Sequence, residues 1–159
     1  MKKKLLFVCL GNICRSPSAE AVMNGLVKEN GLNSDILCDS AGIGGWHVGN
    51  RADSRMRRHA SKRNYDLTSI ARQFDPTIDF DHFDLILGMD DQNISDLKGM
   101  ARNGKDLDKI VRMTDYCNRF DYNSVPDPYY GGDEGFELVL DLLEDACQGL
   151  LNQLQNECK

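Results

Sequence analysis

The sequence predicts an α/β domain in which a single open parallel sheet of four strands has helices on both faces, as in flavodoxin-like and Rossmann-like folds. Three observations support this prediction. Continuous apolar runs of strand length alternate with segments whose apolar residues recur at helical spacing. Runs without polar alternation are typical of strands buried on both faces, as in a parallel sheet. Because the chain has 159 residues and no internal repeat or linker, we expect residues 1–159 to form one domain.

Four apolar runs predict the strands, and residues that favour turns follow the first two. The runs are residues 4–10, 34–41, 83–89 and 109–113. Gly11 and Asn12 follow the first run, and the glycine-rich segment 42–46 follows the second. Parallel sheets of this class bind ligands at the carboxyl ends of their strands. We therefore expect the functional site in the segments that follow these runs.

Four segments with helical spacing of apolar residues lie between and after the strands. They cover residues 16–30, 53–65, 90–102 and 135–156. We expect Ser16 to cap the first helix and Asn30-Gly31 to end it. Either Asp90 or Asp91 is expected to cap the third. A loop without clear periodicity, residues 114–133, precedes the last helix, and loops of that length usually have a function.

The composition excludes several functional classes. With 19 basic and 25 acidic residues the net charge is −6, which argues against a nucleic-acid partner and requires any anion site to be built locally. No run approaches the roughly 20 apolar residues of a membrane span, and the run after Lys4 is too short for a secretory signal. We therefore expect a cytoplasmic monomer with reduced cysteines, in which an oddly placed cysteine is a candidate for chemistry.

The junction between the first strand and the first helix has the character of a phosphate-binding site. Cys9 ends the strand, and the loop after it consists of Leu10, Gly11, Asn12, Ile13, Cys14, Arg15 and Ser16. The N–H groups of such a loop form an anion cradle at a helix N-terminus, which would stabilise a Cys9 thiolate. Arg15 can donate to two phosphate oxygens, and the Ser16 hydroxyl can donate to sulfur. By residue type alone, the better interpretation of Cys9 is an inert, buried strand cysteine, and it is the position at a strand-to-helix junction that favours a chemical role.

Two motifs far apart in the chain resemble those of the low-molecular-weight protein tyrosine phosphatase family. Residues 8–17, Val-Cys-Leu-Gly-Asn-Ile-Cys-Arg-Ser-Pro, resemble its phosphate-binding loop. Residues 125–130, Val-Pro-Asp-Pro-Tyr-Tyr, resemble its general-acid loop. Residues 40–42 with Trp46, and residues 71–73, are further matches. The order, the spacing and the total length agree, so the resemblance covers essentially the whole chain.

The resemblance implies hydrolysis of phosphotyrosine monoesters through a cysteinyl-phosphate, with no cofactor and no metal. Cys9 would be the nucleophile, and Arg15 with the amides of residues 10–15 would hold the phosphoryl oxygens. Asp127 would protonate the leaving phenolate, a useful role because the phenol of tyrosine has a pKa near 10. By residue type alone, Asp127 between two prolines could be structural, and Asp121 is a nearby alternative. Asp133 is a second such alternative.

The resemblance also assigns roles around the phosphate loop. Trp46, Tyr129 and Tyr130 would form aromatic walls that stack on a phosphotyrosine ring. A deep slot suits that long, flat side chain, whereas phosphoserine would leave its phosphate short of the loop. Cys14 is implied to pair with Cys9 under oxidation, the alternative being a small loop residue. The expected partners are therefore phosphotyrosine proteins or peptides.

Three features lie outside these motifs. Ser69 stands three residues before Arg72, at a position where many members of the family carry a histidine that supports a hydrogen-bond network behind the phosphate loop. The sequence therefore does not decide which residues make that network here. The basic residues from 51 to 63 are interpreted as a solvated helix face, with steering of acidic phosphopeptides as the alternative. The histidines form no metal-ligand pattern with the cysteines; they are His47, His59 and His82.

Two other functions are compatible with parts of the sequence. Arsenate reductase resembles this fold and shares the Cys-x5-Arg loop, but it needs an additional pair of cysteines in and after the third strand. Residues 83–92 contain no cysteine, and Cys38 and Cys117 stand alone. A non-catalytic phosphotyrosine-binding module is the second alternative, and binding alone would require neither a thiolate nor an acid.

Overall fold

The computed structural model describes residues 2–157, and its centre is one parallel sheet with the strand order β2-β1-β3-β4. The strands are β1 (Lys3–Cys9), β2 (Ile36–Gly42), β3 (Leu85–Gly88) and β4 (Ile110–Arg112). β1 lies inside the sheet, where Leu5 is paired with Cys38 on one side and with Leu85 on the other. All three strand pairings are parallel, which confirms the predicted fold class.

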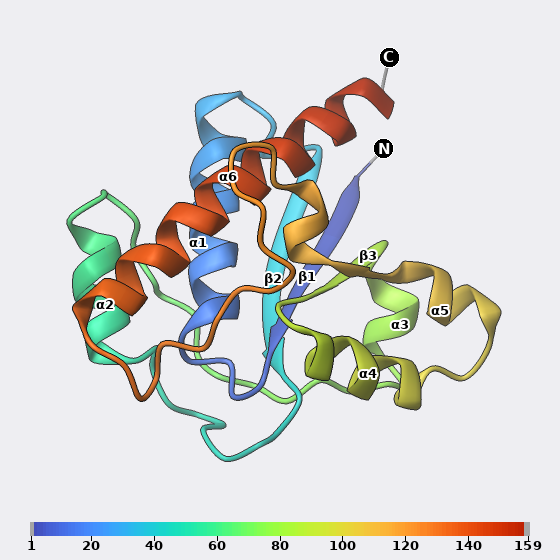
Figure 1. Cartoon of the computed structure of the whole chain (residues 1–159). Helices are drawn as coiled ribbons and strands as arrows, with labels where there is room; N and C mark the ends of the chain where they lie inside the picture. Colours follow the sequence, from blue (N-terminus) through green and yellow to red (C-terminus); the bar gives the residue numbers. More distant parts are fainter. Residues whose placement is uncertain (1, 158–159) are drawn as a thin grey trace.

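Helices cover both faces of the sheet (Figure 1). They are α1 (Arg15–Glu29), α2 (Ser54–Ser61), α3 (Asp79–His82), α4 (Asp91–Met100), α5 (Gly104–Lys109), the 3₁₀ helix η1 (Met113–Tyr116) and α6 (Asp133–Glu157). Alternate residues of β1 point to opposite faces, as the pleat of a strand requires. Leu5 and Phe7 belong to the core shared with α1 and α6, whereas Leu6 and Val8 belong to the core shared with α3 and α4.

Several element boundaries differ from the sequence prediction. α2 ends at Ser61 rather than at residue 65, because Asn64 has a positive φ of 68°, which stops a right-handed helix. α4 ends at Met100 and α6 begins at Asp133, two residues earlier than expected in each case. Asp90 caps α4 by accepting a hydrogen bond from Asn93 N, which decides between the two aspartates considered.

The prediction that Ser16 caps the first helix is wrong. α1 begins at Arg15, and the residue before it, Cys14, makes no side-chain cap hydrogen bond. Ser16 lies inside the first turn and is fully buried. Its Oγ lies 3.0 Å from Cys9 Sγ and accepts a hydrogen bond from the Asn12 side chain, so it does not cap the helix.

The carboxyl ends of β1 and β3 meet the long loop that precedes α6. Val125 N donates to the carbonyl of Met89 at 2.7 Å, which attaches this loop to the end of β3. As a result, residues near 127 lie beside the loop that follows β1, although more than 100 positions separate them in the sequence (Figure 1). Within the described part of the chain, none of the helices is long and apolar enough to cross a membrane.

Candidate active site

The loop between β1 and α1, residues 9–16, turns back on itself at the N-terminus of α1. Asn12 adopts a left-handed backbone conformation with a φ of 59°, which asparagine tolerates better than most residues. Gly42, at the end of β2, packs directly against this turn. A Cβ atom at Gly42 would stand 2.9 Å from the carbonyl carbon of Gly11 and 3.0 Å from the nitrogen of Asn12. Glycine is therefore required for the two segments to approach this closely.

The Cys9 thiol lies at the base of the loop and is buried, since Cys9 is the last residue of β1. Its Sγ is 3.0 Å from the Oγ of Ser16. The side-chain amide of Asn12 donates to the same Oγ at 2.8 Å, which leaves the Ser16 hydroxyl proton free to point at the sulfur. The carbonyl of Ala41 is a second acceptor for that proton, but at 3.4 Å. A hydroxyl that donates to sulfur stabilises negative charge there.

The backbone of the loop forms the wall of an anion site. Among residues 2–157, the N–H groups of residues 11–14 have no hydrogen-bond acceptor. They precede α1 directly, and this helix of 15 residues directs the positive end of its dipole to the same point. Free N–H groups together with a helix N-terminus bind oxyanions such as phosphate.

Arg15 reaches into the same space from the first position of α1. Its guanidinium is held from behind, because Nη1 donates to Asp90 Oδ2 at 2.6 Å and to the carbonyl of Val125 at 3.0 Å. Burial would lower the pKa of Arg15, but the charge of Cys9 and the hydrogen bond to Asp90 outweigh burial and raise it. Arg15 is thus a charged, oriented donor whose Nη2 edge faces the cavity side, where Asp127 Oδ2 stands 3.5 Å away.

Asp127 lies on the opposite wall, in the loop before α6. Its Oδ1 accepts a hydrogen bond from Tyr129 N at 3.1 Å, and its side chain is 40% exposed. Asp121 does not line the cavity, and Asp133 is the first residue of α6, where it is paired with basic residues of the α2 segment. The structure therefore brings Asp127, and neither of the two alternatives, to the phosphate loop.

A cavity of about 310 Å³ connects these groups. Its lining residues are Cys9, Leu10, Gly11, Ile13, Cys14, Arg15, Trp46, His47, Asp127, Tyr129 and Tyr130. Trp46 and Tyr130 stand at the rim, where they are 70% and 95% exposed, whereas Tyr129 is half-buried. The ring of Trp46 lies over Gly44, where a Cβ atom would meet the ring at 1.9 Å. The three aromatic residues therefore line the same cavity as the Cys9 thiol.

Sequence reasoning did not find three residues of the site. His47 lines the cavity, and a Cβ atom at Gly11 would meet its ring at 2.9 Å. Asp90 was expected only as a helix cap, yet its second oxygen holds Arg15. The carbonyl of Val125 also accepts from Arg15. The position of Asp90 directly after a strand was a usable signal. Val125 belongs to the motif of residues 125–130, but the motif gave its carbonyl no role, and nothing in the sequence marks His47.

Cys14 is a buried, free thiol beside the nucleophile position. Burial raises the pKa of the Cys14 thiol far above its ordinary value, and the charges of Asp53 and Cys9 raise it further. Cys14 therefore stays protonated near neutral pH. Of the other described cysteines, Cys38, Cys117 and Cys147, none lines the cavity, so no additional pair stands there for the disulfide relay of an arsenate reductase.

Hydrogen bonds behind the loop run through Asn12 and Arg72. The Oδ1 of Asn12 accepts from Arg72 N at 3.0 Å, and the Arg72 guanidinium is paired with Asp79 and Asp39. Ser69, at the position often held by histidine, makes no side-chain hydrogen bond to any of the described residues 2–157. Asn12 and the backbone of Arg72 therefore fix the loop without a histidine.

The arginines of the α2 segment are not simply a solvated face. Arg63 is paired with three carboxylates of α6, namely Glu137, Asp141 and Glu144, and only 22% of its side chain is exposed. Arg55 donates to the carbonyl of Tyr129 at 2.8 Å. The interpretation of these basic residues as a solvated face is therefore wrong for Arg63, because α6 packs over this side of α2. Across residues 2–157, no group of three or more His, Cys, Asp or Glu is arranged to hold a metal ion.

Known proteins are similar to this chain in sequence and in fold. The family model described as low molecular weight phosphotyrosine protein phosphatase matches residues 4–159. A Synechocystis protein provisionally named low molecular weight protein-tyrosine-phosphatase is 51% identical over 154 residues, which cover 97% of this chain and 98% of the relative. A solved protein tyrosine phosphatase from Entamoeba histolytica, with Hepes in its active site, superposes with a TM-score of 0.95 at 45% identity and covers 99% of this chain and 100% of its own. The structure of YfkJ from Bacillus subtilis gives 0.91 at 41% identity and covers 100% and 98%.

Proposed function

Since the chain belongs to the low molecular weight phosphotyrosine protein phosphatase family and is a protein tyrosine phosphatase, we propose that Cys9, Arg15 and Asp127 carry out its reaction. One observation carries this proposal. A single cavity joins the Cys9 thiol, the free N–H groups of the loop, the oriented guanidinium of Arg15 and the Asp127 carboxyl on the opposite wall. That arrangement matches what phosphoryl transfer from a phenol to a thiolate requires.

In the first step, the Cys9 thiolate attacks phosphorus and the bond between phosphorus and the phenolic oxygen breaks. Asp127 donates its proton to that oxygen, so tyrosine leaves as a neutral phenol. The sulfur–phosphorus bond that forms is a cysteinyl-phosphate. In the second step, water attacks phosphorus, the sulfur–phosphorus bond breaks, and Asp127 takes the proton from the water. Inorganic phosphate leaves and Cys9 returns as a thiolate.

Arg15 and the loop amides stabilise the charge on the three non-bridging oxygens throughout both steps. These oxygens carry the developing charge of a phosphoryl transition state. Arg15 is pre-oriented for them, because Asp90 and the Val125 carbonyl occupy its Nη1 and fix the plane of the guanidinium. A donor that is already in place loses little free energy to reorganisation when the charge develops.

We attribute the preference for phosphotyrosine to the aromatic residues of the cavity. Trp46, Tyr129 and Tyr130 line it together with Cys9, so they can stack on the ring of a phosphotyrosine whose phosphate lies at the loop. Phosphoserine has no ring to stack on them. The expected substrates are therefore proteins or peptides that carry phosphotyrosine.

Cys14 is proposed as a resolving thiol rather than a second nucleophile. Peroxide would oxidise Cys9 to a sulfenic acid and release water, and the Cys14 thiol would condense with it to form a disulfide and a second water. Both sulfurs are buried at the same cavity. The five described cysteines are free thiols, which supports the proposal of a cytoplasmic enzyme. We propose that it acts as a monomer, which light scattering after gel filtration would test.

The test of this function is turnover of para-nitrophenyl phosphate and a phosphotyrosine peptide in the presence of a metal chelator. Cys9→Ser should lower kcat at least about 1000-fold, because no thiolate remains to form the intermediate. Asp127→Ala should lower kcat/KM for the peptide by about 100-fold. Asp121→Ala is a matched control, because Asp121 is exposed and lies outside the cavity, and it should change neither value. Full turnover by Cys9→Ser would overturn the assignment.

A further inference from the structure

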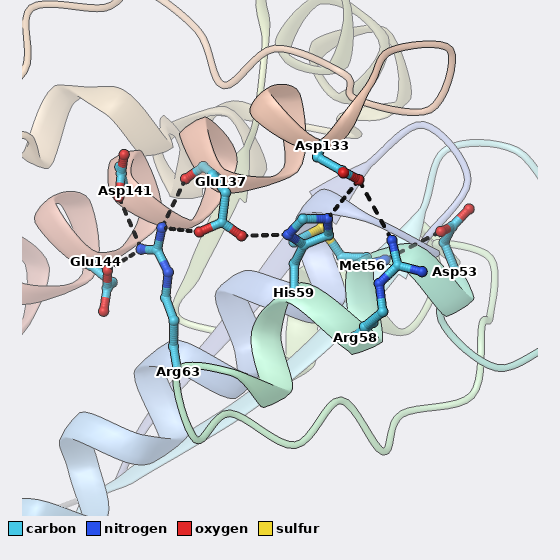
Figure 2. Close-up of polar contacts among 9 residues, drawn as sticks. All are labelled: Asp53, Met56, Arg58, His59, Arg63, Asp133, Glu137, Asp141 and Glu144. Atoms are coloured by element: carbon cyan, nitrogen blue, oxygen red, sulfur yellow. Dashed lines mark hydrogen bonds and ion pairs between the residues drawn. The ribbon is translucent and has the colours of Figure 1, made fainter.

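His59 occupies an unusual position between α2 and α6. Its ring is buried, with 5% of the side chain exposed, and both ring nitrogens face carboxylates (Figure 2). Nδ1 contacts Glu137 Oε2 in a short hydrogen bond, and Nε2 lies 3.1 Å from Asp133 Oδ1. The ring also stacks on Phe136, with centroids 5.4 Å apart and an interplanar angle of 9°. The imidazole is thus fixed on three sides by the first turns of α6.

Both ring nitrogens can donate to these carboxylates only when each of them carries a proton. A neutral imidazole has one donor and one acceptor, and an ionised carboxylate can only accept. A neutral His59 would therefore present a lone pair to one of the two carboxylates. The hydrogen bond from His59 holds the pKa of Asp133 below its ordinary value. The pKa of Glu137 is lowered mainly by the hydrogen bond from Arg63 and to a smaller extent by that from His59. Both carboxyls therefore stay ionised. The imidazolium satisfies both of them.

The cluster is placed where it can act on the general acid. Asp133 is the first residue of α6, and the loop that carries Asp127 runs directly into it. Asp127 itself is weakly held, since its contacts are one hydrogen bond from Tyr129 N and a 3.5 Å approach to Arg15. Its position therefore depends on the backbone of residues 127–133.

Two side chains of α2 contact this loop and the start of α6. One turn before His59, Arg55 donates to the carbonyl of Tyr129 at 2.8 Å and faces the ring of Phe136 at 4.9 Å. His59 holds the other end of the segment at Asp133 and Glu137 (Figure 2).

We propose that His59 is a positioning residue for the general acid: as an imidazolium it fastens α2 to Asp133 and Glu137 and so fixes the loop that carries Asp127. This inference rests on the proposed role of Asp127. His59 does not touch the cavity, so its effect reaches the reaction only through the loop.

The positioning depends on two donors from one ring. Both exist only when each ring nitrogen of His59 carries a proton. The charged groups that face or flank the ring are Asp133 and Glu137 from α6 and Arg58, Lys62 and Arg63 from the α2 segment. The pKa values of both carboxyls are lowered, so both remain acceptors for His59.

The experiment compares two leaving groups in His59→Gln. Phenyl phosphate releases a phenol as basic as that of tyrosine and needs the acid, whereas para-nitrophenyl phosphate releases a much weaker base. We expect kcat/KM at pH 6 to fall about fivefold for phenyl phosphate, a small part of what a positioned acid supplies, and less than about twofold for para-nitrophenyl phosphate. His82→Gln is the matched control, since His82 is exposed on α3, and should change neither. Equal losses for both substrates would reduce His59 to a structural role and overturn the proposal.

A second set of variants separates positioning from general destabilisation. In an Asp127→Ala background, His59→Gln should cause no further loss with phenyl phosphate, because the effect passes through Asp127. Asp133→Asn changes a side chain that is 77% exposed and should reproduce the selective loss at about twofold, even if His59→Gln does not fold. Asp133→Glu keeps a carboxylate at this position and should therefore show no selective loss. An additive loss in the double variant, or no selective loss in Asp133→Asn, would contradict the proposal.

The protonation state can be read directly. Nitrogen-15 NMR of labelled histidine should show both His59 ring nitrogens protonated at pH 6 in the wild-type protein, and a neutral tautomer at that pH would contradict the proposal. If Asp127→Ala leaves the leaving-group ratio unchanged, the proposed function fails. If it changes the ratio and His59→Gln does not, only the role of His59 fails.

Discussion

Replacing Asn12 with alanine tests how the phosphate loop is held in its ligand-binding conformation. Asn12 is 2% exposed and makes two side-chain hydrogen bonds. Its Nδ2 donates to Ser16 Oγ at 2.8 Å, and its Oδ1 accepts from Arg72 N at 3.0 Å. Its φ of 59° also lies in the left-handed region, which alanine disfavours. Alanine therefore removes both hydrogen bonds and adds backbone strain.

The expected magnitude follows from these contacts. Each hydrogen bond is worth about 1 kcal/mol, and alanine in the left-handed region costs about 1 kcal/mol more than asparagine. The free energy of unfolding should therefore fall by about 3 kcal/mol in Asn12→Ala. For a chain of this size that corresponds to a drop in Tm of roughly 6–12 °C. Asn12→Gly loses the same hydrogen bonds without the strain, so it should lose only about 2 kcal/mol.

Urea and thermal unfolding of the wild type, Asn12→Ala and Asn12→Gly measure these differences. Turnover of para-nitrophenyl phosphate in the same samples should fall in both variants, because the Ser16 hydroxyl loses the donor that orients it toward Cys9. The reasoning is refuted if Asn12→Ala melts within about 1 °C of the wild type, or if Asn12→Gly is the less stable of the two variants.

Three further substitutions test other parts of the fold. Gly42→Ala should lower stability by about 2 kcal/mol in urea unfolding because its Cβ meets the backbone of the phosphate loop, whereas Gly99→Ala, with nothing within 4 Å, should not destabilise. Asp90→Asn should lower kcat/KM about tenfold for both leaving groups alike, since it loosens Arg15 and not the acid. A selective effect on phenyl phosphate would contradict that prediction. Burial would raise the pKa of Asp145, but three backbone N–H donors outweigh burial and lower it. Its stabilisation of about 2 kcal/mol is present above the unfolded pKa near 3.9 and is lost as the pH falls through the lower folded value. The wild type should therefore be more stable than Asp145→Asn at pH 7, and the difference should shrink as the pH falls below the unfolded pKa.

Local sequence patterns predicted the strands and the long helices because each carries several turns or alternations of apolar residues. α3, α5 and η1 were missed, since they span 4, 6 and 4 residues and are too short to show a period. The cap of the first helix was misassigned for a different reason. Ser16 has the residue type of a cap, but its hydroxyl contacts Cys9 in a loop whose N–H groups stay free.

The residues of the candidate site also fall into those predicted from the sequence and those found only in the structure. Residues 9–16 are contiguous, so their order alone placed a thiol, a cradle of amides and a cation at one strand-to-helix junction. Asp127 was found from a motif, and no local pattern connects it to Cys9. Only the tertiary structure shows that Asp90 and Val125 hold Arg15 and that His47 lines the cavity.

What the sequence by itself determined about this protein is therefore its fold class, its phosphate loop and its family. These follow from short-range order, namely apolar periodicity and the residue order within two separate motifs. The tertiary structure alone decided what holds the arginine, and that His59 lies between two carboxylates of α6. Contacts of this kind join residues 74 or more positions apart, and they depend on how helices and loops pack around the sheet rather than on any pattern along the chain.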